Sequence, residues 1–297
     1  MTRHLALDSL RALRPHQWTK NLLVFVPLAL TPQHVGDPAK QLTALFAFLA
    51  LSMVASAGYV VNDLLDLDAD RQHPTKRDRP FASGALPLGW GWALAGLLGA
   101  AGLGLALATT PEGFVGMLVL YAGATLAYSG FFKRQLLLDV IVLAGLYTLR
   151  VIAGAAAVDI GLTPWLLAFS LFIFLSLAFA KRYAELRLLA SRSETHAQGR
   201  AYQVDDLDLI AMLGSTSGYL SVLVLCLYIN SEEVRALYRT VDVLWFLSPI
   251  LLYWISRIWL LAKRGELPGD PVAFAVRDPA SWVSGALMAG VIVAAVM

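Results

Sequence analysis

The sequence has little charge: only 15% of its 297 residues are Asp, Glu, Lys or Arg, while 58% are hydrophobic. Soluble domains carry roughly 25% charged residues, and they need them to cover a surface that faces water. This shortage, together with a mean hydropathy of +0.65, disfavours a soluble enzyme, a disordered chain and a nucleic-acid-binding domain. We therefore expect a polytopic membrane protein without a nucleic-acid partner.

Cysteine is almost absent. The single one, Cys226, excludes an internal disulfide and a metal site built from several cysteines. A cleavable signal peptide is not expected either, because Arg11, Arg14 and Lys20 precede the first apolar run and no small-residue cleavage site ends it. The net charge of +2 says nothing about partners, so the placement of the charges matters more.

Long apolar runs fill the chain and leave no room for a soluble domain. A helix needs about 20 mostly apolar residues to cross a bilayer, and windows of this size predict nine spans, the first interrupted by Pro27 and Pro32. They cover 17–34, 41–61, 88–108, 113–129, 136–157, 163–181, 208–229, 241–261 and 280–297. The sequence thus predicts an all-α fold of nine transmembrane helices in a single domain, 1–297.

The basic residues between these spans lie almost entirely on one side. With the N-terminus in the cytoplasm, 19 of the 23 Lys and Arg residues fall in inner segments or adjoining span ends, and only Lys40, Arg235 and Arg239 in outer ones. Positive charge is retained on the cytoplasmic side, so the count supports the span number and the orientation together. The long inner loops, 62–87 and 182–207, also hold the densest acidic clusters. We expect the chemistry at the cytoplasmic face of the cell membrane.

An acidic run lies at the cytoplasmic end of the second span. If the helix continues, Asp63, Asp66 and Asp70 fall at i, i+3 and i+7 and share one face with Asn62. Three carboxylates on one face repel each other unless a cation lies between them, and Mg²⁺ is usually held by one or two carboxylates plus substrate phosphates. We predict these aspartates as catalytic Mg²⁺ ligands. The alternative is a solvated acidic helix end; an EF-hand is excluded because its central Gly and closing Glu are missing.

A basic segment, 71–84, follows at once and contains His73, Lys76, Arg77 and Arg79. Arginine forks and lysine point charges neutralise anionic oxygens, so a basic loop beside an acidic face predicts phosphate binding. The alternatives are the ordinary cytoplasmic bias of positive charge and attraction to lipid head groups.

The two segments together, Asn-Asp-x-x-Asp-x-x-x-Asp and then His-Pro-x-Lys-Arg-x-Arg-Pro, resemble the first aspartate-rich motif of the UbiA-type prenyltransferase superfamily. The similarity covers nearly the whole chain. It implies nine transmembrane helices around a lateral, lipid-accessible cavity, with cytoplasmic cap loops that bind Mg²⁺ and a diphosphate.

The second motif departs from that of ordinary members, which is rich in aspartate. After the sixth span this chain has Lys181, Arg182 and Glu185, and an acidic stretch at 205–208 comes only some twenty residues later. Several segments instead resemble one branch, the decaprenyl-phosphate phosphoribosyltransferases: 14–21, 128–133, 139–140, 150–155, 181–186 and 269–272. This branch implies transfer of 5-phosphoribose from phosphoribosyl diphosphate to a polyprenyl phosphate, with release of diphosphate.

Basic residues then acquire two roles. Three would assist at the leaving diphosphate: Lys76, Arg77 and Arg79. Four would position the anionic lipid phosphate: Lys20, Arg150, Lys181 and Arg182. The predicted substrate-binding set is completed by Asn62, Tyr128, Lys133, Asp139 and Glu185.

Arg150 lies within the fifth span, eleven residues after Asp139 and therefore about three turns further on the same face. A charge inside a membrane normally faces a bundle interior or a wet cavity, so we expect Arg150 to line the cavity. The alternative is a structural ion pair with an acid on a neighbouring span. For Lys181 and Arg182 the alternative is snorkelling at the membrane boundary.

Two other functions are weighed. One is a prenyltransferase that joins an allylic polyprenyl diphosphate to an aromatic acceptor. The other is a transporter or lipid-binding protein, which the concentration of charge on one face disfavours. The sequence leaves the lipid chain length and the oligomeric state open, and a homo-oligomer is compatible with it.

Overall fold

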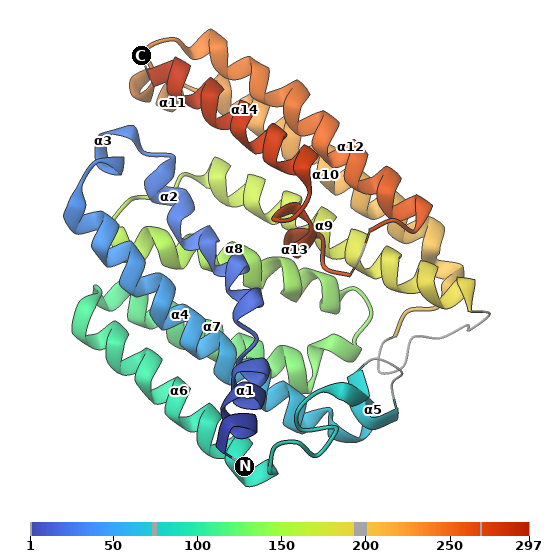
Figure 1. The fold of residues 1–297 in the computed structure, drawn as a ribbon. Coiled ribbons are helices and arrows are strands. Elements are labelled where there is room, and N and C mark those ends of the chain that lie inside the picture. The colour runs from blue at the N-terminus through green and yellow to red at the C-terminus, as the bar shows by residue number, and fades with distance from the viewer. Residues whose placement is uncertain (1, 73–75, 193–200, 268, 297) are drawn as a thin grey trace. The chain divides into compact units, whose positions relative to one another are not determined.

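The computed structural model describes residues 2–72, 76–192, 201–267 and 269–296 (Figure 1). Their contacts group into two compact units, one of residues 1–135 and 149–161, the other of residues 136–148 and 162–297. Both units are helical, as predicted. Helix α8 (Leu138–Val158) contributes its N-terminal part to the second unit and its C-terminal part to the first.

The first unit is built around α4 (Pro38–Leu65), against which α6 (Leu88–Thr109) and α7 (Glu112–Gly130) pack (Figure 1). Helices α4 and α6 lie so close at Gly102 that a Cβ atom there would come within 2.8 Å of the carbonyl oxygen of Ala50. The remaining elements of this unit are α1 (Thr2–Leu13), η1 (Pro15–Phe25), α2 (Val26–Ala29), α3 (Pro32–Val35), α5 (Leu67–Gln72), η2 (Lys76–Asp78) and η3 (Phe132–Arg134).

The expected first span, 17–34, is not one long helix. It consists of the 3₁₀-helix η1 and the short helices α2 and α3, and each of these three elements has a proline in its first turn. Proline is tolerated there because its missing N–H would have no intrahelical partner, whereas it would interrupt a continuous α-helix. The prolines therefore divide the segment instead of merely kinking it.

This broken segment runs antiparallel to α4. The Trp18 indole donates to the Ser56 hydroxyl (2.9 Å), the Asn21 amide donates to the Ser52 hydroxyl (3.0 Å), and the ring of Phe25 lies 5.7 Å from that of Phe48. The partners step backwards along α4 as the segment advances. The segment from residue 15 to residue 35 thus follows most of the length of α4.

The second unit contains four long helices that pack in sequence-adjacent pairs: α9 (Pro164–Ser191), α10 (Leu207–Ile229), α12 (Leu247–Arg264) and α14 (Pro279–Val296). Figure 1 shows α10, α12 and α14 side by side. The shorter elements are η4 (Val204–Asp206), α11 (Glu232–Leu237), η5 (Val241–Phe246) and α13 (Pro271–Ala275). Gly214 of α10 provides the room for close packing, because a Cβ atom there would collide with Trp259 and Phe179.

Eight helical segments of the described residues are long and apolar enough to cross a membrane, and they match the last eight predicted spans. Large apolar side chains remain exposed on them, such as Leu97 at 68%, as is normal for a surface that faces lipid. Helices α4 and α9 extend beyond the predicted spans, by four residues to Leu65 and by ten to Ser191. The extension of α4 carries the start of the acidic motif, Asn62 and Asp63, and that of α9 carries Arg182 and Glu185.

Candidate functional site

The acidic motif lies where α4 ends and α5 begins. The helix does not continue as expected: Asp66 is the C-cap residue of α4, and α5 starts at Leu67. The backbone N–H of Asp66 still donates to the carbonyl of Asn62 (2.9 Å), and that of Asp70 donates to the carbonyl of Asp66 (2.8 Å). The three predicted metal ligands therefore belong to a helix end, a cap and a new short helix.

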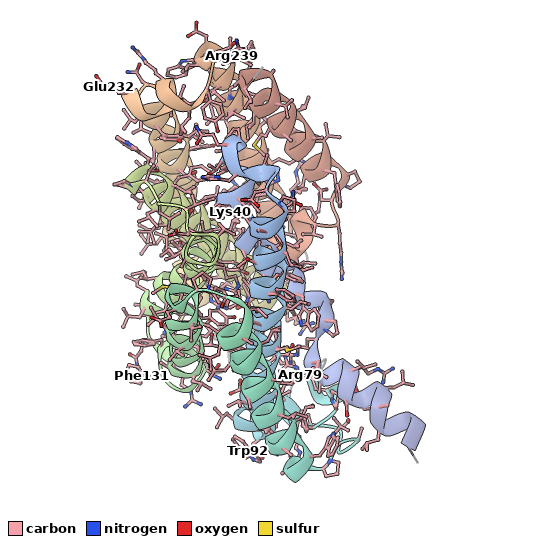
Figure 2. All side chains as sticks on the ribbon, turned by 90° about the vertical axis from the view of Figure 1, so that its left-hand side faces the viewer. Lys40, Arg79, Trp92, Phe131, Glu232 and Arg239 are labelled. Atoms are coloured by element: carbon pink, nitrogen blue, oxygen red, sulfur yellow. The ribbon has the colours of Figure 1, made fainter. Side chains whose placement is uncertain are left out.

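Two of the three carboxylates converge on one guanidinium group. Nη1 of Arg79 lies 3.1 Å from Oδ1 of Asp63 and 2.5 Å from Oδ2 of Asp70. Oδ1 of Asp63 also accepts a bond from Nη2 of Arg14 at 2.6 Å. Figure 2 shows Arg79 at the end of α4 opposite Lys40, so this cluster occupies one end of the first unit. Its two carboxylates are matched by two arginines.

The other oxygen of Asp63 has no such match. Asp63 is buried, and within the described part of the chain its Oδ2 lies without a hydrogen-bond partner. A buried carboxylate oxygen left without a partner is costly, and a cation ligated by this oxygen would offset the cost. Asp63 and Asp70 therefore fit an Mg²⁺ ion, which needs only one or two protein carboxylates when substrate phosphates supply further oxygens.

Asp66 has a different partner. Nζ of Lys133, from η3, lies 2.5 and 2.7 Å from the two oxygens of Asp66. Among the described residues no group of three or more acidic, His or Cys side chains has the arrangement of a metal site. The structure thus brings together two of the three predicted ligands, and a three-aspartate ligand set stays a prediction.

The other predicted residues of the first unit surround this end of α4 or lie deeper in the unit. Lys76 and Arg77 are exposed on η2, and Lys20 is buried on η1. Asn62 on α4 and Tyr128 on α7 are half-buried. His73 lies outside the described residues.

Arg150 is buried in the first unit, as expected of a charge within a span. Its Nε donates to Oδ1 of Asn21 (2.9 Å), and its Nη2 donates to the hydroxyl of Tyr121 (2.7 Å), whose ring lies 4.7 Å from the guanidinium carbon. Asn21 in turn donates to Ser52. Arg150 therefore connects η1, α4 and α7 through neutral side chains, and contact with substrate stays a prediction.

In the second unit, Arg182 forms a buried cluster with two acids. Its Nε and Nη2 donate to the two oxygens of Asp139 (2.5 and 3.2 Å), and its Nη1 donates to Glu185. The Arg182 side chain is only 1% exposed, so snorkelling does not describe it. This pairing fixes α9 to the start of α8.

Lys181, the neighbour of Arg182, is 23% exposed and points to a different acid. Its Nζ lies 3.7 Å from Oδ2 of Asp270. Asp270 is itself held by the Tyr147 hydroxyl (3.2 and 3.4 Å) and by the backbone N–H groups of Val272 and Ala273. The N-terminal end of α13, which Asp270 caps, therefore reaches the basic motif.

Sequence reasoning missed Arg14, Tyr121, Tyr147 and Asp270 as site residues. Arg14 and Asp270 lie in segments that resemble the phosphoribosyltransferase branch, so a signal for them was available. Tyr147 lies three residues before Arg150 and so shares its helical face, which was a signal too. Tyr121 carries none, because an aromatic residue in an apolar span is typical of a core.

Comparisons with known proteins agree with the fold. The UbiA prenyltransferase family model matches residues 22–275. A UbiA homolog from Archaeoglobus fulgidus, solved bound to GPP and Mg²⁺, is similar with a TM-score of 0.70, covering 97% of this chain and 99% of that one at 16% identity. At this identity the likeness shows the fold alone.

Relatives of known sequence differ in what they are named for. The uncharacterized protein y4nM of Sinorhizobium fredii is 39% identical over 293 residues, which are 98% of this chain and only 56% of that relative. The nodulation protein NoeC of Azorhizobium caulinodans is 35% identical over 92% of this chain and 88% of NoeC. A decaprenyl-phosphate phosphoribosyltransferase of Mycolicibacterium smegmatis is 32% identical over 93% of this chain and 88% of the enzyme.

Proposed function

We propose, starting from the fact that this chain belongs to the UbiA prenyltransferase family, that it transfers 5-phosphoribose from phosphoribosyl diphosphate to a polyprenyl phosphate of the decaprenyl type. The family makes the chain a membrane-embedded transferase. The donor and the acceptor are our inference, supported by the relative from Mycolicibacterium smegmatis whose name states this activity.

The observation that carries the proposal is the basic character of the second motif. An enzyme that holds an allylic diphosphate between two metal–carboxylate clusters needs acids there. In this chain the acids at this position are paired with basic groups: Asp139 and Glu185 with Arg182, and Asp270 with the ammonium group of Lys181, which stays 23% exposed. A cation at this position suits an acceptor that is itself a phosphate.

In the proposed reaction, an oxygen of the lipid phosphate bonds to the anomeric carbon of the ribose. The bond from that carbon to the diphosphate breaks, and the diphosphate leaves with the electron pair. The acceptor oxygen is already anionic and needs no general base, so the protein contributes alignment and charge. Mg²⁺, when bound, neutralises charge that develops on the leaving diphosphate.

The residues around the end of α4 serve the donor in this scheme, whereas Lys20 and Arg150 of the same unit would position the lipid phosphate. Asp63 and Asp70 would hold the metal, and Arg79 would pass from these carboxylates to the diphosphate. Lys133 holds Asp66 at the end of α4, which fixes the turn between α4 and α5. Lys76 and Arg77, exposed on η2, would meet the outer phosphate oxygens.

We further propose nine crossings with the N-terminus in the cytoplasm. Eight are the long helices, and the ninth is the broken segment that runs antiparallel to α4. Its Trp18 and Asn21 side chains are bonded to Ser56 and Ser52 of α4, and irregular backbone is tolerated at membrane depth where it is buried against protein. This topology puts the acidic and the basic motif on the cytoplasmic side.

The decisive experiment compares two reactions of the purified protein. One mixture contains ribose-labelled phosphoribosyl diphosphate and polyprenyl phosphates of several chain lengths with Mg²⁺. The other contains a labelled allylic polyprenyl diphosphate and an aromatic acid. We expect labelled lipid in the first mixture alone. Prenylation of the aromatic acid without any phosphoribosylated lipid would contradict the proposal.

A further inference from the structure

Arg14 has a backbone conformation that few arginines adopt. It lies between α1 and η1 with φ 51° and ψ 57°, in the left-handed region, directly before Pro15. A non-glycine residue is strained there, and a following proline restricts it further. Such a conformation persists only where the surroundings hold it.

The surroundings of Arg14 hold both its backbone and its side chain. The hydroxyl of Ser56 donates to the carbonyl of Leu13 (2.8 Å), which fixes the preceding residue on α4. The guanidinium lies 5.7 Å from the ring centre of Tyr59 and donates to Oδ1 of Asp63 at 2.6 Å. The strained turn thus aims the Arg14 head group at the buried carboxylate.

The charges of this cluster balance. Asp63 and Asp70 contribute two negative charges, and Arg14 and Arg79 contribute two positive ones, all joined by contacts of 2.5–3.1 Å. A divalent cation that entered alone would leave two positive charges in excess beside a largely buried site, where electrostatic repulsion is strong. A diphosphate that enters with the metal removes this excess and offers both arginines new acceptors.

We propose that Arg14 makes metal binding depend on the diphosphate donor. Its guanidinium neutralises Asp63 while the donor is absent and moves its hydrogen bonds to the diphosphate oxygens when metal and donor enter together. Oδ2 of Asp63, which lacks a partner within the described residues, is the oxygen open to the metal. This inference rests on the diphosphate donor of the proposed function. To the proposed function it adds that metal and donor bind cooperatively, and that Arg14 is the cause of this cooperativity.

The test measures Mn²⁺ binding, as a stand-in for Mg²⁺, by electron paramagnetic resonance with the purified full chain. Inorganic diphosphate is the second probe. For the unaltered protein we expect weak Mn²⁺ binding that diphosphate strengthens by about tenfold or more, within the usual range of coupling between sites. In Arg14→Gln we expect Mn²⁺ alone to bind at least about fivefold more tightly, with most of the strengthening by diphosphate lost.

Arg11→Gln is the matched control. Arg11 lies three residues earlier, its side chain is 77% exposed, and its partner is Asp8. The Arg11→Gln substitution removes one positive charge from the same part of the chain as Arg14→Gln. We expect it to leave Mn²⁺ binding and its strengthening by diphosphate unaltered. Arg14→Lys, which keeps the charge, should keep Mn²⁺ alone weakly bound.

Two results would overturn the inference. The first is that the unaltered protein binds Mn²⁺ equally well with and without diphosphate, a measurement that requires no variant. The other is a folded Arg14→Gln protein whose Mn²⁺ affinity and coupling are unchanged. Neither probe contains ribose or lipid. Cooperative Mn²⁺ binding without phosphoribosylated lipid would therefore count against the proposed function and leave the role of Arg14 standing.

Discussion

Asp63 and Asp68 are the same chemical group five residues apart, but their environments are opposite. The Asp63 side chain is 1% exposed and contacts Arg14 and Arg79, whereas the Asp68 side chain is 94% exposed and lies 4.0 Å from Arg71. Burying a carboxylate costs desolvation free energy, which charged or hydrogen-bonding partners or a bound ligand must offset. The run of four aspartates therefore contains residues of unequal importance.

The pair gives a matched test of the metal assignment. Asp63→Asn should lower kcat of phosphoribosyl transfer by about 100-fold or more, because a neutral amide holds Mg²⁺ poorly and leaves the cluster with one positive charge in excess. Asp68→Asn should stay within about twofold of the unaltered protein, as surface substitutions usually do. Initial rates at saturating Mg²⁺ measure both. An equal loss of kcat in the two variants would contradict the assignment of the buried Asp63 as the metal ligand.

Lys181 and Asp270 form the second residue-scale test. If Asp270 orients Lys181 toward the lipid phosphate, Asp270→Asn and Lys181→Met should each raise KM for polyprenyl phosphate by about tenfold, and the double variant should be no worse than Lys181→Met. Asp278→Asn is the control: Asp278 lies beyond the other end of α13 and pairs with Arg257 at 2.6 and 2.9 Å. It should lower thermal stability without raising that KM. Additive effects of Asp270 and Lys181 would refute the coupling.

At the scale of the element, η1 packs closely against α8 at Gly154. A Cβ atom on Gly154 would lie 2.1 Å from the carbonyl oxygen of Val24, so no side chain fits there unless η1 moves. Gly154→Ala should therefore destabilise the protein by about 1–3 kcal/mol, the usual cost of overpacking. Thermal unfolding in detergent measures the change. Gly145→Ala on the same helix, with open space around its Cβ position, should be neutral or slightly stabilising.

Elements were easier to predict than their partners. The long helices follow from apolar runs of about 20 residues, so eight spans could be located from hydropathy alone. The segment at 17–34 is apolar as well, but Pro27 and Pro32 divide it, and Asn21 needs Ser52 as a hydrogen-bond partner. The pairs Arg14–Asp63 and Lys133–Asp66 join residues 49 and 67 positions apart. They depend on how helices align, which no local pattern encodes.

For the whole molecule, the nine-crossing topology is tested by sidedness. Cys226 is the only native cysteine, so Cys226→Ser gives a background for single labelling sites. In sealed right-side-out vesicles, which keep the cytoplasmic face inside, Lys40→Cys should react with a membrane-impermeant thiol reagent. Arg77→Cys should react only after permeabilisation. An N-terminal tag should be protected and a C-terminal tag exposed. An exposed N-terminal tag would mean that the segment at 15–35 does not cross.

Ser52 and Ser56, both fully buried on α4, have a consequence for biosynthesis. They accept the polar groups of Asn21 and Trp18, and backbone or side chains without such partners are costly in lipid. If the segment at 15–35 crosses the membrane as proposed, it is poorly suited to leave the translocation channel by itself. It must wait for α4 and partition into the bilayer with it as a hairpin, so replacing both serines by alanine would impair insertion before it impairs turnover.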